Sequence, residues 1–220
     1  GMPVETPLTI ALSTGWNIIS YPCEFTQNAL DAVQPLIDAG VLEKVIDEAG
    51  GSIFHLPFPP PNGQWSNTIG DFQSGEGYYL KVNQSSSLTI QCTDVPLLSR
   101  TIIPPDVPTV FFTPAYDNNP YFPMHIVMQP CEELQAGDEI AVYDGNMCVG
   151  ATVVGSDTEI PIIIKASQQE PDLEKINGYT EGNIIQLMVW RHQSGEVLQA
   201  GYDYLEGAQR FAPLETLTGK

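Results

Sequence analysis

The chain has few basic residues: Lys and Arg together number 8, against 27 Asp and Glu, for a formal net charge of −19. Counted from Pro104, ten acids and three bases before it give −7, and seventeen acids and five bases after it give −12. A nucleic-acid backbone or an anionic membrane surface would be repelled, and no basic stripe opposes this. The sequence therefore predicts no nucleic-acid partner. The acidic surplus indicates solubility in a crowded or salty extracellular medium, or carboxylates that bind Ca²⁺.

Long apolar runs are also lacking. No stretch of eighteen apolar residues occurs, so no transmembrane segment is predicted. No signal peptide is visible, and Gly1 before Met2 is typical of the residue that remains after a cleaved tag. We expect an extracellular or cell-surface protein, exported by a signal peptide that this sequence does not include.

Motifs of familiar catalytic sites are missing. The three histidines, His55, His125 and His192, lie on separate expected strands or strand ends and lack the spacing of zinc ligands. No Gly-x-Ser-x-Gly, Gly-x-Gly-x-x-Gly or phosphate-loop pattern occurs. The sequence predicts a protein that is not an enzyme and that needs no cofactor, calcium being the one metal left open.

Two pairs of neighbouring carboxylates, Glu132-Glu133 and Asp138-Glu139, could suggest a glycosidase. Adjacent residues of a strand face opposite sides, however, so neither pair is placed to cooperate directly. Cys148 lies on an expected strand without a basic neighbour, which disfavours a nucleophile.

The four cysteines include no Cys-x-x-Cys spacing, which excludes zinc ribbons and thioredoxin-like motifs. Three pairings are possible in principle. Because two cysteines fall in each half, the favoured pairs are Cys23–Cys92 and Cys131–Cys148. The alternative is four reduced thiols that act as small apolar residues.

Nineteen glycines and nineteen prolines predict many turns between short elements. One helix is expected to begin at Ala29 with Asn28 as its cap and to end at Gly40, and Pro35 should break it or restart it. The expected strands cover residues 8–12, 16–21, 41–45, 52–56, 78–82, 88–92, 109–113, 124–129, 139–143, 147–154, 159–165, 183–190 and 197–200.

These elements predict a mainly β fold with two β-sandwich-like domains, the first with one short α-helix. The first domain would cover 1–94. A proline-rich, semi-rigid linker would follow at 95–108, and an Ig-like β-sandwich would occupy 109–220. Within the last domain, Asp144-Gly145 joins two β-rich segments and is the strongest hairpin signal in the chain.

Two sets of motifs carry a family resemblance. Gly15-Trp16-Asn17-Ile18-Ile19-Ser20, followed by the run 75–82, resembles a GWNxIS…GxGYxxKV module of secreted and surface proteins of Bacteroidetes. The run 137–151 (GDEIAVYDGNMCVGA) and the run 178–183 resemble a companion module of the same proteins. The resemblance spans roughly 8–92 and 109–200 and implies a non-catalytic appendage or stalk unit. It carries over no catalytic residue.

Turns rich in oxygen ligands are candidates for one Ca²⁺ site. They supply Asp117, Asn119, Asp144, Asn146 and Asp157. No complete Asp-x-Asp-x-Asp-Gly loop is present, and turn formation alone would also account for Asn and Asp at these positions.

Aromatic residues in or near expected loops are candidates for a sugar-binding platform: Trp65, Phe58, Tyr116 and Tyr121. The alternative is that the aromatics pack in cores, and Trp190, which ends an apolar run, looks most like a core residue. The expected function is a non-catalytic extracellular interaction, adhesion or spacer module with a glycan or protein ligand. The alternatives are a carbohydrate-binding appendage of a polysaccharide-utilisation system and, third, a glycoside-active enzyme.

Overall fold

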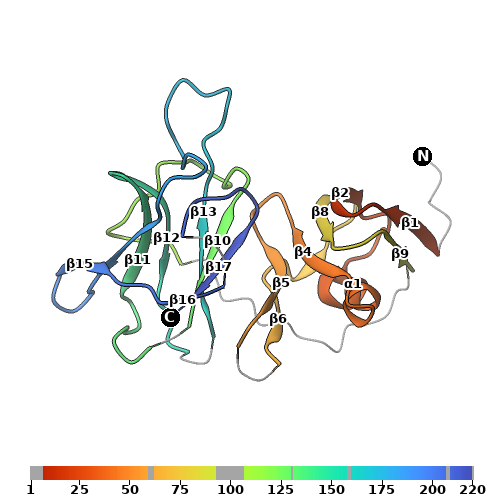
Figure 1. Cartoon of the computed structure of the whole chain (residues 1–220), viewed down its shortest axis with the longest axis horizontal. Coiled ribbons are helices and arrows are strands. Elements are labelled where there is room, and N and C mark those ends of the chain that lie inside the picture. The colour runs from red at the N-terminus through yellow and green to blue at the C-terminus, as the bar shows by residue number, and fades with distance from the viewer. Residues whose placement is uncertain are drawn as a thin grey trace. The chain divides into compact units, whose positions relative to one another are not determined.

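The computed structural model has a mainly β fold with one helix (Figure 1). It describes residues 7–58, 62–92, 107–129, 131–157, 160–206 and 209–219. The chain forms two compact units, Gly1–Ile103 and Pro104–Lys220. Their boundary falls within the expected linker, of which residues 95–106 lie outside the described residues. In the described chain, no helix has the length and apolar character needed to cross a membrane.

The first unit is built on one five-stranded antiparallel sheet. Its order is β2 (Gly15–Ser20), β8 (Gly77–Val82), β4 (Leu42–Ile46), β5 (Ser52–Leu56) and β6 (Gln64–Asn67). One face packs against the helix α1 (Ala29–Asp38) and two ribbons, β1 (Leu8–Leu12) with β9 (Ser86–Ile90) and β3 (Gln27–Asn28) with β7 (Asp71–Phe72). The core joins Ile19 and Leu80 of the sheet to Val33 of the helix and Leu88 of the ribbon. The second layer is thus a helix with short ribbons rather than a full second sheet.

The start of α1 confirms the expected cap. The Asn28 side chain accepts hydrogen bonds from the backbone N–H groups of Leu30 and Asp31, at 3.0 and 3.1 Å. The expected break at Pro35 is wrong, because the helix runs through this residue. An interior proline costs about 3 kcal/mol. The burial of Val33 and Leu36, on either side of it, offsets this cost.

The second unit is a sandwich of two four-stranded sheets around a common core. One sheet has the order β13 (Ile162–Ala166), β10 (Met124–Met128), β17 (Thr216–Gly219), β16 (Tyr204–Glu206). The other has the order β12 (Met147–Val153), β11 (Glu139–Asp144), β14 (Gln186–Trp190), β15 (Val197–Ala200). The Asp144-Gly145 hairpin joins β11 and β12 as expected. The β10–β17 pair is parallel, unlike the antiparallel sheets of an immunoglobulin domain. It arises because the last strand returns beside the first strand of the unit and runs in the same direction.

One expected strand and one expected disulfide are absent. Residues 109–113 do not form a strand. Cys23 and Cys92 are joined by a disulfide, with 5.3 Å between their Cα atoms, whereas Cys131 and Cys148 are both free. The expected Cys131–Cys148 pair is wrong: Cys148 pairs with Tyr143 near the turn of the β11–β12 hairpin, whereas Cys131 lies in the loop that leads into the opposite end of β11.

Candidate functional site

A short segment of the second unit, residues 107–115, lies against the outer face of the β12-β11-β14-β15 sheet, and we call it the strap. Phe112 is 4% exposed and packs on Ala141 and Cys148 of that face. Ala115 N–H donates to the Cys148 carbonyl at 2.8 Å. The small side chain of Ala141 leaves room for the Phe112 ring, so the sheet accepts the strap closely.

The Glu139 carboxylate holds the strap by its backbone. Its Oε1 accepts from the N–H of Val110 at 2.5 Å, and its Oε2 accepts from those of Phe111 and Phe112 at 3.0 and 2.9 Å. Glu139 is 1% exposed. One buried carboxylate therefore satisfies the backbone donors that a neighbouring strand would otherwise satisfy. This is why the β-prone sequence TVFFT is not a strand.

The strap completes an aromatic cluster, which we define as Phe111, Phe112, Tyr143, Trp190 and His192. The Phe111 and Trp190 rings are stacked, with centroids 5.2 Å apart and 1° between their planes. The edges of other rings meet these two: Phe112 lies 5.0 Å from Phe111 and His192 5.7 Å from Trp190. Phe112 also contacts Tyr143, at 6.1 Å. The rings thus support one another in fixed orientations.

The exposed members of this cluster are Phe111, at the tip of the strap, and His192. Phe111 is 48% exposed and its neighbour Val110 is 88% exposed. Trp190 is half-buried and packs against the small cluster of Phe112, Ala141 and Cys148 on the outer face of the sheet, rather than in the core between the two sheets. A ligand approaching this face would meet Val110 and the Phe111 ring.

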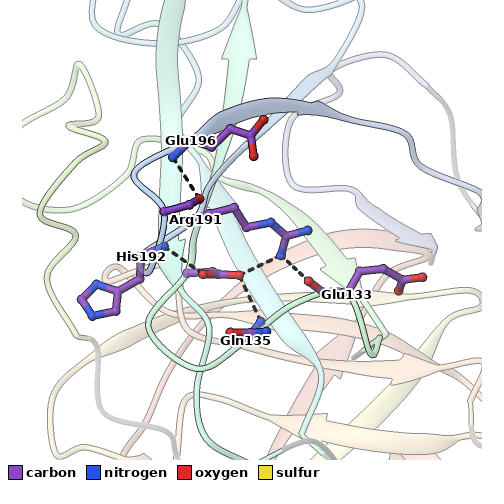
Figure 2. Close-up of polar contacts among 7 residues, drawn as sticks. Glu133, Gln135, Arg191, His192 and Glu196 are labelled. Atoms are coloured by element: carbon purple, nitrogen blue, oxygen red, sulfur yellow. Dashed lines mark hydrogen bonds and ion pairs between the residues drawn. The ribbon is translucent and has the colours of Figure 1, made fainter.

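Asp138 fixes the loop beside the cluster. Figure 2 shows Arg191, Gln135 and His192 converging on one carboxylate, that of Asp138. The distances are 2.8 Å from Arg191 Nη1, 3.1 Å from Gln135 N and 3.0 Å from His192 N. Arg191 also donates to the backbone carbonyl of Glu133. Burial alone would raise the pKa of Asp138, but these hydrogen bonds and the guanidinium charge hold that pKa below its usual value.

Both carboxylates of the Asp138-Glu139 pair therefore hold neighbouring backbone segments in place. One carboxylate binds the end of β14 and the other binds the strap. Cys148 shows no sign of activation either, because burial raises the pKa of its thiol to about 11.

The aromatics singled out from the sequence are divided between the two units, two in each. Trp65 lies in β6 rather than in a loop; it packs against the core of the first unit and meets His55 at 5.5 Å. Phe58 is buried. In the second unit, Tyr116 and Tyr121 are half-buried, the first donating to the Lys165 carbonyl at 3.4 Å and the second contacting Phe122.

The candidate calcium ligands are dispersed as well. Asp117, Asn119, Asn146 and Asp157 are exposed. The Asp144 carboxylate accepts from Thr180 N at 2.8 Å and from Asn183 Nδ2 at 2.9 Å. In the described ranges, no three His, Cys, Asp or Glu side chains are grouped to hold a metal ion. Residues 158 and 159 of the last candidate turn lie outside those ranges.

The residues of the second motif set instead serve the fold. Asp144 binds Thr180 and Asn183, so the hairpin turn and the run 178–183 are joined. At Gly150, a Cβ atom would lie 2.4 Å from the Lys165 carbonyl oxygen, where no other residue fits. These positions account for much of the motif without a ligand.

The strap and its exposed ring were missed from the sequence because 109–113 reads as an ordinary strand. One signal could have found them: adjacent aromatics on a strand face opposite sides, so Phe111 and Phe112 cannot both be buried in one core. Comparison with protein-family models, with curated proteins and with solved structures finds no match to this chain.

Proposed function

We propose that the chain is a non-catalytic interaction module of an extracellular or cell-surface protein, and that the tip of the strap is its ligand-contacting surface. The observation that carries this proposal is the Phe111 ring. It is 48% exposed, yet it is stacked on Trp190 and its backbone N–H is bound by Glu139.

An exposed aromatic ring held in place is suited to binding. A mobile side chain loses rotamer freedom when it binds, whereas a ring that is already fixed loses little. A pure spacer would have no use for such a ring and would bury it. The exposed ring therefore favours a binding module over a spacer.

The proposed extracellular location is supported by a disulfide, by the net charge and by the motif resemblance. The Cys23–Cys92 disulfide is of the kind that persists in oxidising compartments. The net charge of −19 and the resemblance of the two motif sets to surface proteins of Bacteroidetes agree with it.

The test is an array of glycans and of extracellular proteins, probed with the pure chain in Ca²⁺ and again in EDTA. We expect selective binding to a small set of ligands in both conditions. A blank array would overturn the proposed binding function. Hydrolysis products in the bound glycan spots, detected by mass spectrometry, would overturn its non-catalytic character.

A carbohydrate-binding appendage is the second candidate, favoured by the exposed Phe111 ring and the exposed, polar His192, both of which contact Trp190. Aromatic faces pack on sugar rings while a few polar groups fix orientation. Affinity gel electrophoresis with soluble polysaccharides tests this candidate. Retardation by at least one polysaccharide is expected, and migration unchanged by all of them would leave a protein ligand as the better account.

A further inference from the structure

The apolar surface at the tip of the strap continues across β14 onto the edge strand β15. Trp190 of β14 lies directly opposite Val197 of β15. Directly opposed residues of neighbouring strands project from the same face of a sheet. Trp190 projects from the outer face, where Phe111 stacks on it. Val197, which is 41% exposed, therefore lies beside Trp190 on the outer face.

The β15 side of this face is open. The strap covers β11 and β12, since Phe112 packs on Ala141 and Cys148. The first three residues of β15 are exposed, and in the described part of the chain this strand pairs with β14 alone. Four apolar residues follow one another here, by chain neighbourhood, ring stacking and strand pairing in turn. We call them the strap platform: Val110, Phe111, Trp190 and Val197.

A buried negative charge lies directly behind the platform. Both oxygens of the Glu139 carboxylate accept from the backbone N–H of Phe111, at 3.1 and 3.0 Å. Its other partners are also backbone N–H groups of the strap, and no basic side chain of the described ranges forms an ion pair with it. Charges in such a partly desolvated place interact more strongly than charges in water. A cation that reaches the Phe111 ring is therefore attracted by Glu139.

The charge of the whole second unit acts in the same direction. Seventeen acids and five bases give Pro104–Lys220 a net charge of −12. Arg191, the basic residue that follows Trp190, is paired with Asp138 at 2.8 Å, so its charge is offset. A field of one sign raises the association rate of ligands of the opposite sign. An anionic ligand would be repelled and a neutral glycan would gain nothing from the field, whereas a cationic ligand is attracted.

We propose that the strap platform binds a basic segment of a protein partner, with a cationic side chain on the Phe111 ring and an apolar side chain on Val197. The inference rests on the proposed function, since it uses the same exposed ring, and it names the class of ligand. A cation within about 6 Å of a ring centroid is attracted by the negative face of the ring. Arginine fits best, because its planar guanidinium is weakly hydrated and stacks on aromatic rings.

The ligand class is tested with an array of short peptides of random sequence. The pure chain is applied at about 0.05 M and at about 0.5 M NaCl, because salt screens the attraction between exposed charges. We expect the bound peptides to be enriched in arginine and lysine, and the affinity of the best peptide to fall about fivefold or more at the higher salt. Replacing its arginine with citrulline, a neutral analogue of the same shape, should weaken binding about tenfold.

The position of the surface is tested with two lysine variants of β15. Val197→Lys puts a charge of the ligand's own sign on the platform and should weaken binding of the best peptide about tenfold or more. Leu198→Lys is the matched control, because it adds the same charge to the same strand on the opposite face, where Leu198 lies opposite Val189 of the sandwich core. It should bind almost as the wild type does.

Urea midpoints show whether both lysine variants keep the stability of the wild type. Val197→Thr keeps the shape of the side chain and replaces Val197→Lys if lysine lowers the midpoint. It should weaken binding about threefold, because a hydroxyl replaces a methyl group in the apolar contact.

The outcomes separate this inference from the proposed function. Bound peptides without an excess of basic residues, or a citrulline peptide that binds as tightly as the arginine peptide, would overturn the ligand class. Equal affinities of Val197→Lys and Leu198→Lys would overturn the place of β15 in the platform. A blank peptide array, together with a glycan that binds the wild type but not Phe111→Ala, would overturn this inference and leave the proposed function intact. Peptides bound equally by the wild type and Phe111→Ala would overturn both.

Discussion

At the residue scale, Glu139 determines the backbone conformation of the strap. Its carboxylate accepts from three consecutive backbone N–H groups, those of Val110, Phe111 and Phe112. A segment with strong β propensity is thereby satisfied without a neighbouring strand and is held with one ring in solvent. The candidate binding surface depends on this single side chain more than on any contact of the rings themselves.

Glu139→Gln should lower the free energy of unfolding by about 2 kcal/mol or more, because an amide presents a donor where the strap supplies donors, and buried groups are left unsatisfied. Urea denaturation measures the loss, and limited proteolysis should cut residues 107–115 faster. Glu132→Gln, at an exposed carboxylate in the preceding loop, is the control and should change little. Equal stability in the two variants would mean that Glu139 does not hold the strap.

Asp138 predicts a pH dependence. Its folded pKa lies below the usual value, because hydrogen bonds from Arg191 and two backbone amides outweigh the effect of burial. A carboxyl whose pKa is depressed by folding stabilises the protein above its unfolded pKa, about 3.9, and this contribution is lost as pH falls through the folded value. The urea midpoint of the wild type should therefore fall more steeply between pH 5 and pH 3 than that of Asp138→Asn. Since the other acids titrate in both proteins, parallel curves would show that Asp138 contributes nothing.

At the scale of elements, the sequence correctly predicted the features that depend on neighbouring residues alone. Asn28 caps α1 as expected, and β1 and β15 have the bounds that their sequences predict. The strand β17 was missed because TLTG is short and has a single large apolar residue, and its place beside β10 comes from a return of the chain across the whole unit. Such long-range pairing leaves no local trace in the sequence.

The site was harder to predict than the fold for the same reason. The bond from Glu139 to the strap spans 29 residues at Val110, and the stack of Phe111 on Trp190 joins residues even farther apart. Trp65 was assigned to a loop because prolines precede it, although its own strand β6 begins just after them. Residue type identified aromatics as candidates but did not show which of them the fold exposes.

The helix α1 provides the prediction at this scale. Pro35 is exposed, so its ring contributes little packing, while it removes a backbone donor from the helix interior. Pro35→Ala should raise the free energy of unfolding by about 1–2 kcal/mol, the regained helical bond being partly offset by greater freedom of the unfolded chain. Thermal and urea unfolding measure the gain. Gln34→Ala, next to it on the exposed face, is the control; a Pro35→Ala protein no more stable than this control would contradict the account.

At the scale of the whole molecule, the two units are stabilised in different ways. The first has a disulfide that joins residues 69 apart in sequence, a closure that stabilises a fold by about 4 kcal/mol in the chain-entropy model. The second has no disulfide among its described residues and relies on a sandwich core, with buried carboxylates that fix its loops.

The central claim is that the exposed ring of the strap contacts the ligand. Its most direct test is the dissociation constant of the best ligand from the array, measured for the wild type, for Phe111→Ala and for Phe25→Ala. Phe25 is a matched control, since it is 52% exposed and lies in the first unit. We predict that Phe111→Ala weakens binding about tenfold or more, the equivalent of about 1.4 kcal/mol, while Phe25→Ala leaves it unchanged. Equal affinity in the wild type and Phe111→Ala would contradict the claim.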